Sequence, residues 1–155
     1  MKNKFIILIF AGIIFCAFIV FFSFQNKTDR ICFKENCYKV EIARTQEEKE
    51  KGLMFWENLG KEQGILFINS EENIFSFWMK NMKFPIDIIW LNNNFEVVFI
   101  EKNAQPCGES ECLNINPEKL AQYILEINAG EADRIGLQIG DKARCGALFC
   151  NAIKN

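Results

Sequence analysis

The stretches Pro85–Leu91 (PIDIIWL) and Phe95–Glu101 (FEVVFIE) lie on either side of the polar tripeptide Asn92–Asn94. Both stretches are rich in β-branched and aromatic residues, which favour strands, whereas a cluster of asparagines favours a turn. This order predicts a β-hairpin. Pro85 marks the edge of its first strand, because proline has no N–H to donate to a neighbouring strand.

Further short strands are expected on the amino-terminal side of this hairpin. Apolar and alternating segments predict them over Ile31–Phe33, Tyr38–Ala43, Gly64–Ile68 and Ile74–Met79. In the last of these segments, a period of two residues puts Phe75, Phe77 and Met79 on one face and Ser76, Trp78 and Lys80 on the other.

A short charged helix is predicted between the second and third of these strands. Thr45 is followed three residues later by Glu48, which is the spacing of a capping box at a helix N-terminus. Gly52 ends the helix, because glycine readily adopts the left-handed conformation found there.

After the hairpin, residues 102–118 have the composition of a loop. A strand follows at Tyr123–Ile127, then a helical turn at Gly130–Ile135 and a last strand near Lys142–Leu148. Strands outnumber helices, and few helices lie between them. The sequence therefore predicts a mainly β (α+β) domain, with a compact barrel-like sheet and two short helices.

Twenty residues without a charge, Phe5–Phe24, precede this domain. At a rise of about 1.5 Å per residue, a helix of that length spans the roughly 30 Å hydrocarbon core of a bilayer. Lys2 and Lys4 precede it, so the positive-inside bias predicts a cytoplasmic N-terminus and an extracytoplasmic C-terminal domain. A cleaved signal peptide is the alternative, although its apolar region is usually shorter. We expect a single-pass anchor in residues 1–24, a linker in 25–30 and one domain in 31–155.

Charge and composition exclude several classes of function. Without Lys2 and Lys4, 16 basic residues remain against 20 acidic ones, a net charge of −4 for the exported part. No stripe of lysine or arginine is present, so nucleic acid is not an expected partner. The chain has no histidine, which excludes Ser-His-Asp and Cys-His nucleophile systems and histidine metal sites. We expect no cofactor and no metal, and the sequence leaves the oligomeric state open.

Six cysteines follow the predicted anchor as three pairs with one spacing: Cys32/Cys37, Cys107/Cys112 and Cys145/Cys150. An exported domain lies in an oxidising compartment, which favours disulfides, although six cysteines permit many connectivities. The alternative is a zinc site, for which this spacing is permitted but a shorter one is commoner. We expect these six cysteines to form disulfides, and the sequence leaves their connectivity open.

Several short motifs together resemble the domain-of-unknown-function 192 family. In chain order they are Gly52–Met54, Gly64–Phe67, Phe77–Asn81 with Pro85–Ile88, Pro106–Cys107, Tyr123–Glu126 with Ala129–Gly130, and Gly136 with Gly140–Asp141. The resemblance runs over roughly Val40–Arg144, and its most specific part is the WMKN segment with the downstream proline and aspartate. It implies a compact, mainly β, barrel-like fold in exported proteins, and no established reaction.

Asp87 is the most suggestive polar residue, because a bare carboxylate is costly to bury among apolar neighbours. Lys80 and Asn81 precede it across a turn. Trp78 shares the face of Lys80, where its ring can stack on a cation or a sugar. We expect these four residues to converge on one concave patch. The structural alternative is an Asp–Lys or Asp–backbone bond that fixes the turn.

Glu126 is a second acid in an apolar strand, with Arg134 as a candidate structural partner. The favoured hypothesis is a non-catalytic, membrane-tethered extracytoplasmic module that binds a cell-envelope ligand or a partner protein. Its candidate ligand-binding residues are Trp78, Lys80, Asn81, Asp87 and Glu126. The alternative is a hydrolase-like envelope enzyme with Asp87 and Glu126 as a carboxylate pair about 5–10 Å apart in a shared cleft. A third reading is a scaffold without a small ligand.

Overall fold

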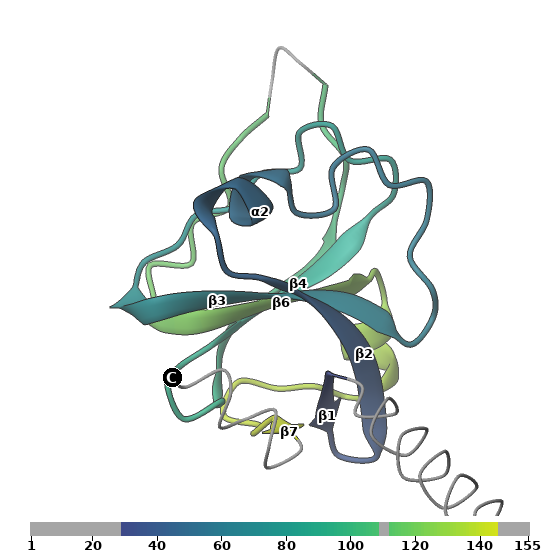
Figure 1. The fold of residues 1–155 in the computed structure, drawn as a ribbon. Helices are drawn as coiled ribbons and strands as arrows, with labels where there is room; N and C mark the ends of the chain where they lie inside the picture. The colour runs from purple at the N-terminus through teal and green to yellow at the C-terminus, as the bar shows by residue number, and fades with distance from the viewer. Residues whose placement is uncertain (1–28, 109–111, 146–155) are drawn as a thin grey trace, which may run out of the picture.

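The computed structural model describes residues 29–108 and 112–145, which form a curled seven-stranded sheet with two short helices (Figure 1). The spatial order of the strands is β5-β4-β6-β3-β2-β1-β7. Their bounds are β1 (Arg30–Phe33), β2 (Asn36–Ala43), β3 (Gln63–Asn73), β4 (Ile86–Leu91), β5 (Val97–Ala104), β6 (Ala121–Asn128) and β7 (Arg144–Cys145). The helices are α2 (Gln46–Lys51) and α3 (Glu131–Arg134). The predicted mainly β class with two short helices is confirmed, and the sheet is a half-barrel.

The connections follow the local signals of the sequence. β4 and β5 form the predicted antiparallel hairpin, with Ile89 opposite Ile100. β2 and β3 are parallel, and α2 lies in the connection between them, as parallel pairing requires a crossover. All the other neighbouring strands of the sheet are antiparallel.

The segment between α3 and β7 crosses the open side of the half-barrel (Figure 1). The Val97 N–H donates to the Asp141 carbonyl at 2.9 Å, and the Ala143 N–H donates to the Phe95 carbonyl at 2.8 Å. These bonds tie the β5 edge to the chain that leads into β7. The two ends of the sheet are therefore joined by backbone hydrogen bonds without a further strand.

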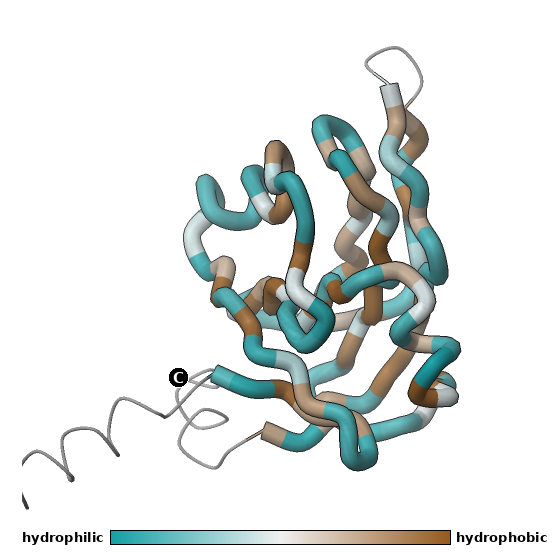
Figure 2. The backbone as a smooth tube through the Cα atoms, turned by 90° about the vertical axis from the view of Figure 1, so that its right-hand side faces the viewer, coloured by the Kyte–Doolittle hydropathy of each residue, from teal (hydrophilic) through white to brown (hydrophobic). Residues whose placement is uncertain are grey.

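The sheet carries an apolar core on each face. The core inside the half-barrel, called the inner core here, includes Ile89 and Leu125. The core on the opposite face, the outer core, includes Ile88, Trp90 and Ile124. Successive side chains of a strand point to opposite faces, so β4 and β6 contribute to both cores, and every residue of β4 is buried. Figure 2 shows hydrophobic residues gathered on segments in the middle of the domain and hydrophilic residues on many of its peripheral loops.

Helix α2 has the capping box that its sequence predicts. The Glu48 N–H donates to the Thr45 hydroxyl at 3.2 Å, and the Thr45 N–H donates to the Glu48 carboxylate at 2.9 Å. Gly52 follows the helix at φ 45°, in the left-handed region that favours glycine. A Cβ at this position would lie 3.2 Å from the Phe67 ring, a tight contact that the ring would have to relieve by a small shift.

The predicted strand Ile74–Met79 is wrong as a strand, although its alternation is correct. Strand β3 continues to Asn73, and the segment after it makes only isolated bridges, one of them from Phe77 to Ile115. Phe77 still packs against the outer core, whereas Trp78 is half exposed. The segment lies over the face of the sheet, where the Trp90 indole N–H donates to the Phe75 carbonyl at 2.9 Å. The backbone of this segment therefore bonds the Trp90 side chain and the loop residue Ile115, and not a neighbouring strand.

Some predictions lie outside the described residues. They are the anchor Phe5–Phe24, most of the linker, and the predicted last strand beyond Cys145. Within residues 29–108 and 112–145, no helix has the length and apolar character needed to cross a bilayer.

Candidate functional site

A cleft of about 350 Å³ opens on the outer face of the sheet, between α2 and residues 75–78. Strands β3 and β6 contribute Phe67 and Ile124 to its lining, and both residues belong to the outer core. The cleft is lined by Gln46, Lys49, Glu50, Phe67, Asn69, Phe75, Ser76, Phe77, Trp78, Asn114 and Ile124. It is named the α2 cleft below.

The apolar part of the α2 cleft is held in place by edge-to-face aromatic contacts. The Phe77 ring meets the Phe67 ring at a centroid distance of 5.0 Å and the Trp90 ring at 5.6 Å, with interplanar angles of 86° and 85°. Trp90 is fully buried and also anchors residue 75 through its indole N–H. Such pairs contribute about 0.5–1.5 kcal/mol each beyond the burial of apolar area. The apolar wall is therefore preformed.

The polar part of the cleft is built from α2 and β3. The Lys49 ammonium donates to Asn69 Oδ1 at 2.7 Å. The Asn69 amide donates to the Gln122 carbonyl at 3.0 Å, and the Gln122 amide returns a bond to the Asn69 carbonyl at 3.0 Å. This reciprocal pair fixes the orientation of Asn69 and hence the position of Lys49. Burial lowers the pKa of the Lys49 ammonium.

Among the predicted ligand-binding residues, Trp78 lines the α2 cleft. Its side chain is 50 % exposed, which is unusual for so large an apolar group. The alternation of residues 75–79 explains this exposure, because Phe77 and Met79 pack toward the outer core and turn Trp78 away from it.

Asp87 lies on the opposite side of the sheet from this cleft. Its carboxylate accepts hydrogen bonds from the backbone N–H groups of Asn103 and Ala132, both at 2.8 Å, and the residue is fully buried. The second bond caps α3, whose own N-cap residue, Gly130, has no side chain to do so. These are the Asp–backbone bonds of the structural alternative.

Lys80 and Asn81 are not hydrogen-bond partners of the Asp87 carboxylate within the described structure. Lys80 forms an isolated backbone bridge with Cys107. The Asn81 amide lies 3.6 Å from the Met54 sulfur, and Asn81 has a positive φ of 58°. Because Asp87 belongs to the inner face and Trp78 to the outer one, the predicted single patch is not formed.

Glu126 is 5 % exposed and belongs to the outer face. Within the described structure its Oε2 atom has no hydrogen-bond partner, and burial raises the pKa of its carboxyl to about 8. The expected pairing with Arg134 is wrong, because Arg134 instead binds Glu131 through two N–H groups at 2.9 and 2.7 Å.

The two buried acids cannot act on one substrate. In the register of β4 and β6, Asp87 is opposite Ile127 of the inner core and Ile88 of the outer core is opposite Glu126. Residues directly opposite each other share a face of the sheet, so the two carboxyl groups point to opposite faces. The geometry therefore lacks the shared cleft that a carboxylate pair requires.

Sequence reasoning missed the polar wall of the cleft. The charged helix α2 has no buried residue and looks like an ordinary solvated helix, so neither Lys49 nor Gln46 stands out. Asn69 was the available signal, because it is a polar residue at the end of the apolar run Ile65–Ile68.

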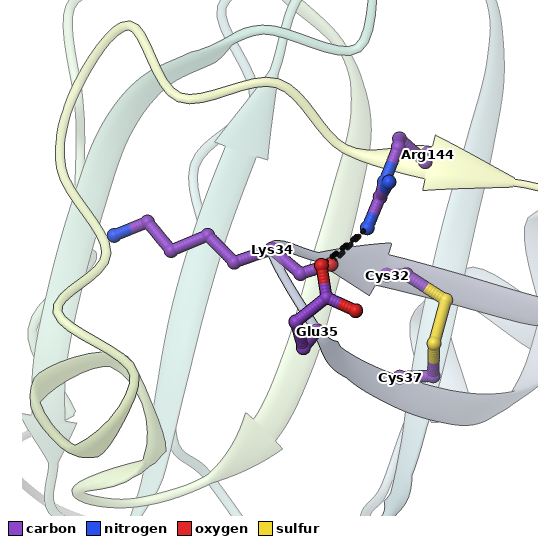
Figure 3. Close-up of a disulfide and its surroundings, with 5 residues drawn as sticks. All are labelled: Cys32, Lys34, Glu35, Cys37 and Arg144. Carbon is purple, nitrogen blue, oxygen red and sulfur yellow. Dashed lines mark hydrogen bonds and ion pairs between the residues drawn. A yellow bond between two sulfur atoms is a disulfide. The ribbon is translucent and has the colours of Figure 1, made fainter.

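The expected disulfide bonding is found in the described structure, which contains Cys32–Cys37 and Cys107–Cys112 and so decides the connectivity of these four cysteines. The first joins directly opposed residues of β1 and β2 (Figure 3). Beside it, the Arg144 guanidinium bonds the Lys34 carbonyl. Cys145 is also disulfide-bonded, and Cys150 lies outside the described residues. The described part of the chain contains no group of three or more side chains arranged to hold a metal ion.

Comparison with known proteins identifies the family. Residues 29–145 match the family model of domain of unknown function 192, described as "Uncharacterized ACR". A search of curated proteins finds no match. A structure of a protein of unknown function from Novosphingobium aromaticivorans is 34 % identical, with a TM-score of 0.66, over 76 % of this chain and 83 % of that one. A candidate transcription regulator from Sinorhizobium meliloti is 28 % identical, with a TM-score of 0.71, over 76 % and 93 %. The chain belongs to the domain-of-unknown-function 192 family.

Proposed function

We propose that this protein is a membrane-tethered, extracytoplasmic binding module that holds a small cell-envelope ligand in the α2 cleft and catalyses no reaction. The observation that carries the proposal is the cleft itself. It combines a preformed aromatic wall with oriented polar groups, which is the usual composition of small-molecule sites. Its volume of about 350 Å³ is in the range of such sites.

The tether and the location are supported by the sequence. The uncharged run Phe5–Phe24 is long enough to span a bilayer, and the lysines before it favour a cytoplasmic N-terminus. The disulfides Cys32–Cys37 and Cys107–Cys112 agree with an oxidising compartment.

The description of the Sinorhizobium meliloti structure as a candidate transcription regulator is not extended to this chain. The exported part has a net charge of −4, and a DNA-binding surface requires clustered lysines and arginines.

The proposal is tested by isolating the full-length chain from its own membranes and identifying bound small molecules by mass spectrometry. We expect a small molecule that accompanies the parent and the Phe55→Ala variant, and that is lost from Trp78→Ala. Phe55 is the matched control, because it is 64 % exposed and aromatic but does not line the cleft. Equal recovery from both variants would contradict the proposed site.

The topology is tested separately, with protease added outside intact spheroplasts. We expect digestion of the domain, with the anchor left in the membrane. Complete protection of a domain that the same protease digests after lysis would contradict the extracytoplasmic location.

A further inference from the structure

The α2 cleft contains a cation, Lys49, that forms no ion pair with an acidic side chain of the described residues. Lys49 is half-buried, and its ammonium bonds the neutral amide oxygen of Asn69. The ion pairs of the described residues all involve other lysines and arginines. A partly desolvated ammonium without an anion is unfavourable, so a negatively charged ligand group here would gain a strong, charge-assisted hydrogen bond.

Glu50 also lines the cleft, but it does not compensate Lys49. Its carboxylate accepts a hydrogen bond from the Gln46 amide at 2.8 Å, and the residue is exposed. Glu50 and Lys49 form no ion pair within the described structure. Of the two charged groups that line the cleft, the positive one is therefore the more buried.

The facing wall of the cleft is aromatic. Phe75 and the half-exposed Trp78 line it, and Trp90 holds the Phe75 backbone in place through its indole N–H. A flat ring gains both apolar burial and offset stacking against such side chains. The cleft volume of about 350 Å³ lies near the lower end for small-molecule sites, which limits the ligand to one or two rings and an acid group.

We propose that the ligand of the α2 cleft is a small ring compound with an anionic group, a carboxylate or a phosphate, that binds Lys49 while the ring packs on Phe75 and Trp78. This inference rests on the proposed function and specifies the chemistry of its ligand. A neutral ring compound would leave the ammonium of Lys49 without an anion, and a cationic one would be repelled by it.

The test uses the full-length chain in lipid nanodiscs, labelled with fluorotryptophan. The chain has three tryptophans, and the Trp78→Phe variant assigns the fluorine resonance of Trp78. Four probes share one naphthalene ring: naphthoate, naphthyl phosphate, neutral naphthalenemethanol and cationic naphthylmethylammonium. We expect the anionic probes to shift the Trp78 resonance at concentrations roughly tenfold or more below the neutral probe, the size of one charge-assisted hydrogen bond. The cationic probe should bind most weakly.

The Lys49→Gln variant should remove the preference for anionic probes and leave the affinity for the neutral probe unchanged. Lys51→Gln is the matched control, because Lys51 is an exposed lysine of the same helix that does not line the cleft. It should keep the preference. The ratio of the naphthoate and naphthyl phosphate affinities separates carboxylate from phosphate ligands.

Equal affinities for the anionic and neutral probes, or a preference that survives Lys49→Gln, would overturn this inference and leave the binding cleft intact. If no probe shifts the Trp78 resonance, the proposed function itself fails with it.

Discussion

The two faces of the sheet each bury one carboxyl group, and the surroundings of the two groups are opposite. On the inner face both oxygens of Asp87 accept backbone N–H groups, one from Asn103 and one from α3. On the outer face Glu126 has an oxygen without a partner within the described structure. The same type of residue, an acid in an apolar strand, is therefore a structural clamp on one face and a destabilised acid on the other.

Asp87 and Glu126 together show that burial alone does not identify a functional acid. Burial disfavours the charged form of any carboxyl group, and hydrogen bonds to that form oppose the effect. Whether a buried carboxyl group is stabilised in its charged form therefore depends on whether backbone N–H donors from elsewhere in the fold reach it. The outer face, with its unsatisfied acid and its cleft, is the less completely stabilised one, which agrees with our proposal that this face binds a ligand.

Removing the inner clamp should have the largest effect. We expect Asp87→Ala to lower the free energy of unfolding by about 3–5 kcal/mol, because the buried N–H of Ala132 and the part-buried N–H of Asn103 lose their carboxylate acceptor. Urea denaturation of the parent and the variant measures the change.

The matched control is Asp141→Ala. Asp141 also accepts a backbone N–H, that of Gln138 at 3.0 Å, but its side chain is partly exposed. Its loss should cost below about 1 kcal/mol, because water replaces the partner. If both variants lose the same free energy of unfolding, Asp87 stabilises the fold no more than an ordinary turn aspartate does.

The outer acid should make stability depend on pH. The pKa of Glu126 is raised by burial from 4.5 to about 8 in the folded state, so the folded protein binds a proton that the unfolded chain has lost in this range. The contribution of Glu126 to stability should be fully present below pH 4.5 and be lost as the pH rises toward about 8, by at most roughly 1.4 kcal/mol per unit.

Denaturation across this pH range in the parent and in Glu126→Gln measures the effect. The variant has no proton to lose, so its advantage over the parent should increase with pH and level off above about 8. A difference between the two proteins that is constant with pH would show that Glu126 does not titrate in this window.

The turn that follows α2 tests how the outer face is positioned. Gly52→Val should lower stability by about 1–3 kcal/mol, because a β-branched residue is strained at φ 45° and its Cβ would press on the Phe67 ring. Thermal melting measures the change, and Gly108→Val is the control, because no other described residue lies within 4 Å of the Cβ added there. An unchanged melting temperature for Gly52→Val would mean that the turn tolerates a side chain.

Trp78→Ala should have the smallest effect on stability, below about 1 kcal/mol, because the side chain is half exposed and lies outside the outer core. If the variant loses the ligand but keeps its stability, Trp78 contributes to binding and not to folding. A large drop in melting temperature would instead make Trp78 part of the packing of residues 75–79.

Much of the fold could be predicted where the determining signals are local. The capping box of α2, the hairpin of β4 and β5, and the alternation around Phe77 all depend on residues close together in sequence, and all are found in the structure. The strand predicted at Ile74–Met79 failed because period-two alternation describes any extended segment with one buried side. It does not say whether the segment joins a sheet or lies across its face.

The candidate site depended on contacts between distant parts of the chain. Asp87 could be recognised from its sequence as a buried acid that needs a partner, but its partners Asn103 and Ala132 come from a later loop and from α3. Lys49 and Asn69 meet only because the tertiary fold brings α2 to the part of β3 that carries Asn69. The local sequence of neither segment predicts that contact.

The mainly β class, the helix boundaries at Thr45 and Gly52, and the family could all be read from the amino-acid sequence, because each depends on spacing over a few residues. The disulfide partners, the face of the sheet that each acid occupies and the surroundings of each acid became known only from the fold. A shift of one residue along a strand reverses the face of its side chain, and the donors or cations that meet it there come from elements far away in the chain.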